Sequence, residues 1–122
     1  MKVLIVQTDQ TLAGTWSSHL ERTGADVSIV SDQDSATRLM HIEDVDVIVL
    51  DLMLASGSAL AVADFASYRQ PDCRVIFVTD APVFSDGSIF QHCANACAYL
   101  PTDTSPSDLA AMVEHYGVHC AV

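Results

Sequence analysis

Positive charge is scarce in this sequence. Its 122 residues include only five Lys or Arg against sixteen Asp or Glu, so the formal net charge is −11. Nucleic acids and anionic membranes attract proteins mainly through Lys and Arg. The composition therefore argues against a direct nucleic-acid partner and against a membrane partner. A basic protein surface, or cations, would be more compatible.

Long hydrophobic runs and targeting segments are also lacking. The longest apolar runs, 3–6 and 45–50, fall well short of the roughly 20 residues that span a bilayer. The N-terminus has one Lys and no small-residue cleavage site, so we expect no signal peptide. Half of the residues are hydrophobic and 17% are charged, as in a packed globular protein. We expect one cytoplasmic domain over 1–122, with a core over about 1–117 and a short C-terminal tail.

The cysteines and the phosphate-binding motifs give no strong signal. None of the four cysteines falls in a CxxC pair, which favours reduced, cytosolic thiols. Cys93 and Cys97 near His92, or His115 and His119 with Cys120, leave a metal site open as a minor alternative to ordinary core and terminal residues. No GxGxxG motif or P-loop is present, and residues 8–15 only faintly resemble a flavin phosphate loop.

Short β-branched apolar runs alternate with segments of helical spacing. The pattern predicts strands over 2–6, 27–30, 45–50, 74–78 and 96–100. It predicts helices that follow a cap at 8–9 and end near 24, follow a cap at 31 or 32, span 59–68, occupy about 88–94, and run from 105 to a stop at 117. The last helix has Ser at the N-cap, Pro at N1 and an acid at N3.

Four of the five predicted helices have a face that should be buried against the sheet. These faces are expected to consist of Leu12, Trp16 and Leu20; Ala36, Leu39 and Met40; Leu60, Ala63 and Tyr68; and Leu109, Met112, Val113 and Tyr116.

Strands that alternate with helices predict an α/β fold with a doubly wound parallel sheet. In such a sheet, ligands bind beyond the carboxyl ends of the strands. The residues that follow the predicted strands are therefore the candidates for a site. They are Gln7, Thr8 and Asp9; Asp51, Leu52 and Met53; Thr79 and Asp80; and 99–103.

Four segments of the sequence resemble the response-regulator receiver family, and the resemblance covers about residues 1–117. They are VLIV at 3–6, VDVIVLDLMLASG at 45–57, VIFVT at 75–79 and ACAYL at 96–100. The resemblance implies a flavodoxin-like (βα)5 sandwich with a five-stranded parallel sheet of order 2-1-3-4-5. It also implies two-component signalling instead of enzymatic activity.

The resemblance assigns roles to individual residues. Asp51 takes the place of the phosphoacceptor, Thr79 that of the hydroxyl that contacts the phosphoryl group, and Tyr99 that of the switch residue. Thr102 stands where the family usually has a Lys. The backbone carbonyl of Met53 takes the place of a metal ligand.

The chain departs from the family at the charged positions. Gln7 and Thr8 replace the two acids that usually help to hold Mg²⁺, and an amide and a hydroxyl contribute no charge to that site. Asp9 is one position later and is either a substitute ligand or a helix cap. Asp80 adds a negative charge, and Thr102 removes the usual positive one. We therefore expect at most weak Mg²⁺ binding, through Asp51, Asp9 and the Met53 carbonyl.

Three functions remain open from the sequence. The first is a receiver that is phosphorylated on Asp51 by a sensor histidine kinase or a phosphotransfer protein. The second is a pseudo-receiver that signals through protein contacts without phosphorylation, and the third, a remote alternative, is a flavin-binding protein or enzyme of the same fold. A homodimer through the fifth-strand face stays open, and any output passes through another protein or a longer chain.

The bond between residues 102 and 103 is the last sequence-based expectation. The family typically has a cis peptide between its Lys and the following Pro, whereas this chain has Thr102 and Asp103. A cis bond before a residue other than Pro costs roughly 2.5–4 kcal/mol. We therefore expect this bond to be trans.

Overall fold

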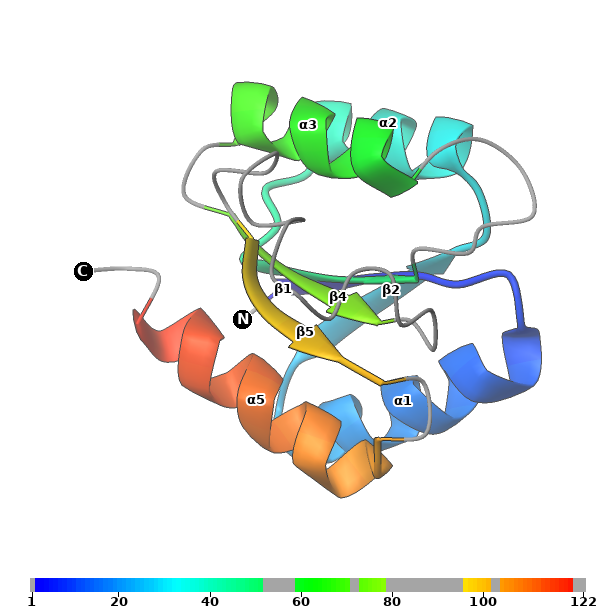
Figure 1. Ribbon diagram of the computed structural model, residues 1–122, viewed down its shortest axis with the longest axis vertical. Coiled ribbons are helices and arrows are strands. Elements are labelled where there is room, and N and C mark those ends of the chain that lie inside the picture. The colour runs from blue at the N-terminus through cyan, green and yellow to red at the C-terminus, as the bar shows by residue number, and fades with distance from the viewer. Residues whose placement is uncertain (1, 52–58, 71–72, 79–95, 102–103, 120–122) are drawn as a thin grey trace.

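Five parallel strands form one sheet in the computed structural model, which describes residues 2–51, 59–70, 73–78, 96–101 and 104–119 (Figure 1). The sheet has the order β2-β1-β3-β4-β5, as predicted. The strand bounds are β1 Lys2–Val6, β2 Asp26–Val30, β3 Val47–Asp51, β4 Arg74–Val78 and β5 Ala96–Leu100.

Two pairs of helices cover the two faces of the sheet (Figure 1). Helices α1 (Gln10–Arg22) and α5 (Pro106–His119) lie on one face, and α2 (Gln33–Ile42) and α3 (Ala59–Arg69) lie on the other. The doubly wound α/β sandwich is thereby confirmed. The helix predicted over about 88–94 lies outside the described residues.

Side chains of the central strands alternate between two hydrophobic cores. Val3 and Ile5 of β1 pack with α1 and α5, whereas Leu4 and Val6 pack with α2 and α3. This alternation is the normal period of a strand. Because both faces are covered, β1 and β3 are apolar at nearly every position.

Polar side chains cap the N-termini of three of the helices. Asp9 caps α1 and Asp32 caps α2, while the Ser105 hydroxyl accepts a hydrogen bond from the Asp108 N–H at 3.2 Å at the start of α5. The backbone and side-chain hydrogen bonds from Ser35 lower the pKa of Asp32. Of the two residues considered for the second cap, Asp32 is the one used.

Four details differ from the sequence-based expectations. Strand β3 runs over Val47–Asp51 instead of 45–50, β2 begins one residue early, and α3 extends one residue further, to Arg69. Helix α5 continues through Gly117 to His119, because a glycine inside a helix costs only about 1 kcal/mol relative to alanine.

The predicted inner face of α3 was wrong for Leu60 and Tyr68 and right for Ala63. Tyr68 is 88% exposed and Leu60 is 37% exposed, whereas Val62, Ala63 and Ala66 are fully buried. These buried side chains lie at i, i+1 and i+4, which form one face of a helix. The largest side chains therefore misled the assignment, because small residues fit closest to the sheet.

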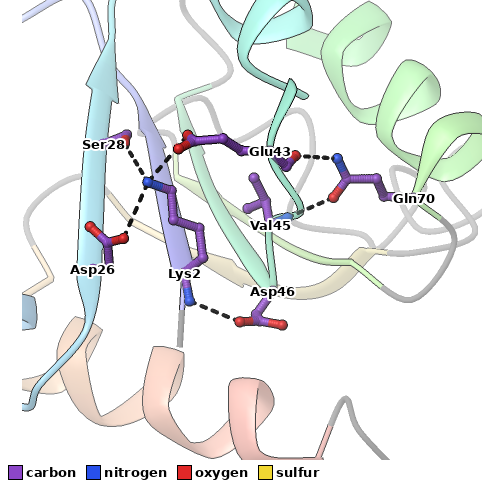
Figure 2. A network of polar contacts seen from close by, with 7 residues as sticks. All are labelled: Lys2, Asp26, Ser28, Glu43, Val45, Asp46 and Gln70. Atoms are coloured by element: carbon purple, nitrogen blue, oxygen red, sulfur yellow. Dashed lines mark hydrogen bonds and ion pairs between the residues drawn. The ribbon is translucent and has the colours of Figure 1, made fainter. Parts of the chain in front are cut away.

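Lys2 is the centre of a polar network at the amino end of the sheet (Figure 2). Its Nζ lies 3.3 Å from a Glu43 carboxylate oxygen and 3.6 Å from one of Asp26, and it donates a 2.8 Å hydrogen bond to the Ser28 hydroxyl. Its backbone N–H donates to Asp46 Oδ2 at 2.8 Å. The only Lys of the chain therefore lies at the end of the sheet opposite to Asp51, where its ammonium group is bound by other side chains.

Gln70 joins the end of α3 to the segment between α2 and β3 (Figure 2). Its Oε1 accepts the Val45 N–H at 2.7 Å, and its Nε2 donates to the carbonyls of Met40 and Glu43, both at 2.8 Å. The Met40 carbonyl lies in the last turn of α2, and the Glu43 carbonyl and the Val45 N–H lie between α2 and β3. The side chain of Gln70 therefore closes the α2–β3 connection.

Candidate functional site

Asp51 ends β3, a central strand between β1 and β4. It is half-buried and lies in register with Val78 of β4. Val47 and Val49 of the same strand face α1 and α5, so the alternation places the Asp51 side chain on that face too. The carboxylate is therefore at the carboxyl end of the sheet, where ligands of doubly wound folds bind.

Gln7 lies beside Asp51 on the same face. Val6 of β1 is in register with Leu50 of β3, so the next residues, 7 and 51, are neighbours at roughly the 4.8 Å spacing of adjacent strands. The Gln7 N–H donates to the Val30 carbonyl at 3.0 Å, which continues the ladder between β1 and β2. Gln7 is only 2% exposed.

The hydrogen bonds of Gln7 define how its amide is oriented. Its Oε1 accepts the Asp9 N–H at 3.0 Å. A backbone N–H needs an acceptor, so this contact identifies the oxygen and leaves Nε2 as the other amide atom. Nε2 is buried and has no hydrogen-bond partner within the described part of the chain. A buried donor in this state costs about 1–3 kcal/mol.

Thr8 and Asp9 are engaged in local structure. The Thr8 hydroxyl donates to the Ser31 carbonyl at 3.4 Å. Asp9 Oδ1 accepts the N–H groups of Thr11 at 3.0 Å and Leu12 at 3.2 Å. The helix-cap interpretation of Asp9 is therefore confirmed, and its role as a metal ligand stays a prediction.

Removal of the Asp9 cap is expected to destabilise the protein. The Asp9→Ala variant should lose about 1 kcal/mol in the free energy of unfolding, because two N–H groups of α1 lose their acceptor. Asp9→Ser keeps a capping oxygen and should retain most of that stability. Denaturant unfolding followed by Trp16 fluorescence measures both. An equal loss in the two variants would show that the charge, and not the cap, is what matters.

The positive side chains lie away from Asp51. Lys2 and Arg74 begin β1 and β4, and Arg22 and Arg69 lie in the last turns of α1 and α3, so these four are at the amino end of the sheet. Arg38 is exposed on α2, which covers the opposite face. These are all the Lys and Arg residues of the sequence. None of the Lys and Arg residues, all of which lie in the described ranges, is therefore placed at the end of the sheet where Asp51 lies.

Several predicted site residues are not described. Thr79, Thr102 and Met53 lie outside the described residues, as does the bond from Thr102 to Asp103. Tyr99 is described in its backbone, where it pairs with Phe77 across β4 and β5. The roles assigned to these residues remain predictions. Asp80 and the cysteines at 93, 97 and 120 are likewise outside the described ranges.

A parallel doubly wound sheet of this strand order defines a flavodoxin-like fold, and Asp51 ends its third strand in chain order. The model of the response regulator receiver domain matches residues 3–114. The chain therefore belongs to the response regulator receiver domain family. Receiver domains are modules of two-component signalling that interact with histidine kinases or phosphotransfer proteins. Among curated proteins, none matches this chain.

Solved structures share the fold. A CheY-like receiver domain protein from Methanospirillum hungatei JF-1 has a TM-score of 0.89 at 20% identity, over 98% of this chain and 95% of that one. A Francisella response regulator 1452 receiver domain has 0.85 at 20%, over 97% of each chain. A Burkholderia pseudomallei response regulator, solved with a phosphorylated aspartic acid, calcium ion and citrate, has 0.82 at 24%, over 98% and 70%.

Receiver domains typically bind Mg²⁺ at the phosphorylation site, and the described residues of this chain fit that ion poorly. Gln7 presents an N–H group instead of a carboxylate, and its Oε1 is used by a backbone N–H. Thr8 donates to a carbonyl, and Asp9 Oδ1 caps a helix. Mg²⁺ prefers anionic and carbonyl oxygens in near-octahedral geometry. Within the described ranges, no three His, Cys, Asp or Glu residues gather as a metal site.

Two features of this molecule were not predicted from the sequence. Gln7 was expected only as the replacement of an acidic ligand, and not as a residue with a buried donor that is unpartnered within the described residues. A Gln directly after the apolar run 3–6 of β1 was the available signal, since its side chain enters the layer between sheet and helix. The hydrogen bonds of Gln70, which join residues up to 30 positions apart, were also not predicted.

In the described part of the chain, no helix is long and apolar enough to cross a membrane.

Proposed function

We propose that this receiver domain accepts a phosphoryl group on Asp51. The observation that carries the proposal is the position of Asp51. Its half-buried carboxylate ends a central strand, between β1 and β4, on the face covered by α1 and α5. The family membership supports the same residue, because the third strand ends on the phosphoacceptor in the segment that the sequence resembles.

The chemistry requires one nucleophile. A carboxylate oxygen of Asp51 attacks the phosphorus of a phosphohistidine on a kinase or phosphotransfer protein. The new P–O bond forms while the P–N bond breaks, and the imidazole nitrogen keeps the electron pair and takes a proton from solvent. The product is an acyl phosphate, whose added negative charge needs hydrogen-bond donors. The chain supplies the nucleophile, and the donor protein supplies the phosphoryl group.

Incubation with acetyl phosphate tests this function. We expect intact-mass measurement to show one added phosphoryl group on the wild-type protein and none on Asp51→Asn, with both proteins folded. Asp64→Asn is a matched control, because Asp64 is an exposed aspartate on α3 and not at the strand ends. Equal labelling of Asp51→Asn and wild type, or no labelling of either, would refute the proposal.

A phosphorylation-independent interaction module is the second candidate. The replacement of the usual acids by Gln7 and Thr8 favours it, as does the placement of the Lys and Arg residues at the amino end of the sheet or on α2. In that case the surface would act without a phosphoryl group, and binding of a partner would be the same for wild type and Asp51→Asn. The labelling experiment separates the two candidates.

The extent of the domain, its location and its partners are further proposals. We propose that the chain functions as one domain over 1–122 and in the cytoplasm. A strongly acidic surface favours a partner with a basic docking face, and this is compatible with a kinase or phosphotransfer protein. A homodimer through the fifth-strand face is a further proposal, which sedimentation of the purified protein would decide.

A further inference from the structure

The side-chain amide of Gln7 has one half engaged and one half unengaged. Its Oε1 is held by the first turn of α1 through the Asp9 N–H at 3.0 Å. Its Nε2 is buried and has no partner among the residues that the structure describes. Native proteins pair almost all buried donors, so a donor left in this state calls for a functional explanation.

The position of this donor relative to Asp51 follows from the register of the sheet. Gln7 continues β1 by its hydrogen bond to Val30, and it lies next to Asp51 on the face that α1 and α5 cover. The contact from Asp9 holds Oε1 on the α1 side of the amide. Because Oε1 is engaged, Nε2 is the atom of the Gln7 amide that is left to interact with a group carried by the neighbouring Asp51.

We infer that Gln7 takes over part of the role of a divalent cation, with its Nε2 donating a hydrogen bond to an oxygen of a phosphoryl group on Asp51. The inference rests on the proposed function and adds a consequence to it. The amide is already held through its Oε1, so the donor loses little conformational freedom when charge develops on the phosphoryl oxygens. Gln7 stands at a position where the family usually has an acidic residue that helps to hold Mg²⁺. Phosphorylation of Asp51 therefore depends little on Mg²⁺.

The response of the folded protein to Mg²⁺ is the first test. We expect millimolar MgCl₂ to leave the unfolding temperature of the wild-type protein unchanged beyond its general salt effect, measured with NaCl of equal ionic strength. Gln7→Glu keeps the oxygen that accepts the Asp9 N–H and places a second carboxylate beside Asp51. This variant should melt lower in EDTA, because like charges repel, and should recover with Mg²⁺. A Mg²⁺-induced rise in wild type as large as that in Gln7→Glu would overturn the inference.

Labelling by acetyl phosphate with Mg²⁺ and with EDTA is the second test. Wild type should be labelled at rates within a few-fold of each other in the two buffers. Gln7→Met removes the donor, so its metal-free rate should fall by roughly tenfold to a hundredfold or more. A wild-type rate that drops more than a hundredfold in EDTA would overturn the inference while leaving the proposed function intact. Absence of label in both buffers would overturn both.

The amide signal of Gln7 in ¹⁵N NMR gives a readout that does not depend on rates or on Gln7→Met folding. On phosphorylation of Asp51, the Gln7 side-chain NH₂ resonances should move and become protected from exchange. The Gln70 amide is a built-in reference, because both of its ends are already bonded at the opposite end of the sheet. A shift of Gln7 no larger than that of Gln70 would contradict the hydrogen bond.

Discussion

The triple variant Gln7→Asp, Thr8→Asp and Thr102→Lys is expected to accept a phosphoryl group on Asp51 faster than wild type when Mg²⁺ is present. The change restores two acids and one cation at positions where the family has them. We expect an increase of roughly a hundredfold or more, since one preorganised electrostatic contact at a reacting centre is worth about that much. The measurement is the labelling rate with acetyl phosphate and Mg²⁺, on protein shown to be folded.

When Mg²⁺ is removed with EDTA, the same variant is expected to lose its ability to be labelled by acetyl phosphate. The two new acids repel the phosphoryl oxygens unless a cation lies between them, and the Gln7 donor is gone. Asp51→Asn in the triple background is the control for labelling at other sites. A triple variant no faster than wild type in Mg²⁺ would show that Asp80 or the backbone beyond β3, and not the missing charges, limits the reaction.

Replacement of Gln70 by methionine is expected to cost roughly 2–4 kcal/mol in the free energy of unfolding. Methionine has a similar length but no polar atoms. The Val45 N–H and the carbonyls of Met40 and Glu43 would therefore lose a partner each. These groups are only partly buried, so water recovers some of the loss. Urea unfolding followed by Trp16, which is 1% exposed, reports the change.

Gln70→Glu distinguishes the hydrogen bonds from simple packing. It keeps an acceptor for the Val45 N–H but places a carboxylate against two carbonyl oxygens. This raises the pKa of the carboxyl in the folded state, so the destabilisation is present at neutral pH and shrinks as the pH falls through that folded pKa. Losses below about 0.5 kcal/mol in both variants, as for ordinary surface changes, would contradict the account of Gln70.

The order of strands and helices could be predicted because it depends on local patterns. Apolar runs of strand length and helical spacing identified all five strands and the four described helices, and the receiver resemblance supplied the strand order. The ends of the elements were less certain. Val45 has a side chain typical of a strand, yet its N–H donates to Gln70, directly after α3, and the ladder to β4 starts only at Val47.

The inner face of α3 shows a second limit. Side-chain size suggested Leu60 and Tyr68 as core residues, but the helix approaches the sheet through Val62, Ala63 and Ala66. Hydrophobic periodicity cannot decide between two faces that both carry apolar side chains. Only the packing of α3 against α2 and the strands decides it.

The candidate site was predictable in position and not in its details. Strand ends alone brought Gln7 and Asp51 to the same edge, as the register confirms for the strands that precede them. The orientation of the Gln7 amide depends on the backbone N–H at the start of α1, which sequence patterns do not report. The capping role of Asp9 was predicted as one of two alternatives and is confirmed, whereas its role as a metal ligand stays a prediction.

The location of the phosphoryl group on the chain tests the central claim most directly. Borohydride converts an aspartyl phosphate to homoserine, so labelled protein can be reduced, digested and sequenced by mass spectrometry. We predict homoserine at position 51 in the wild-type protein, and no homoserine in Asp51→Asn. Homoserine at Asp9, Asp80 or another aspartate, with position 51 unmodified, would contradict the account.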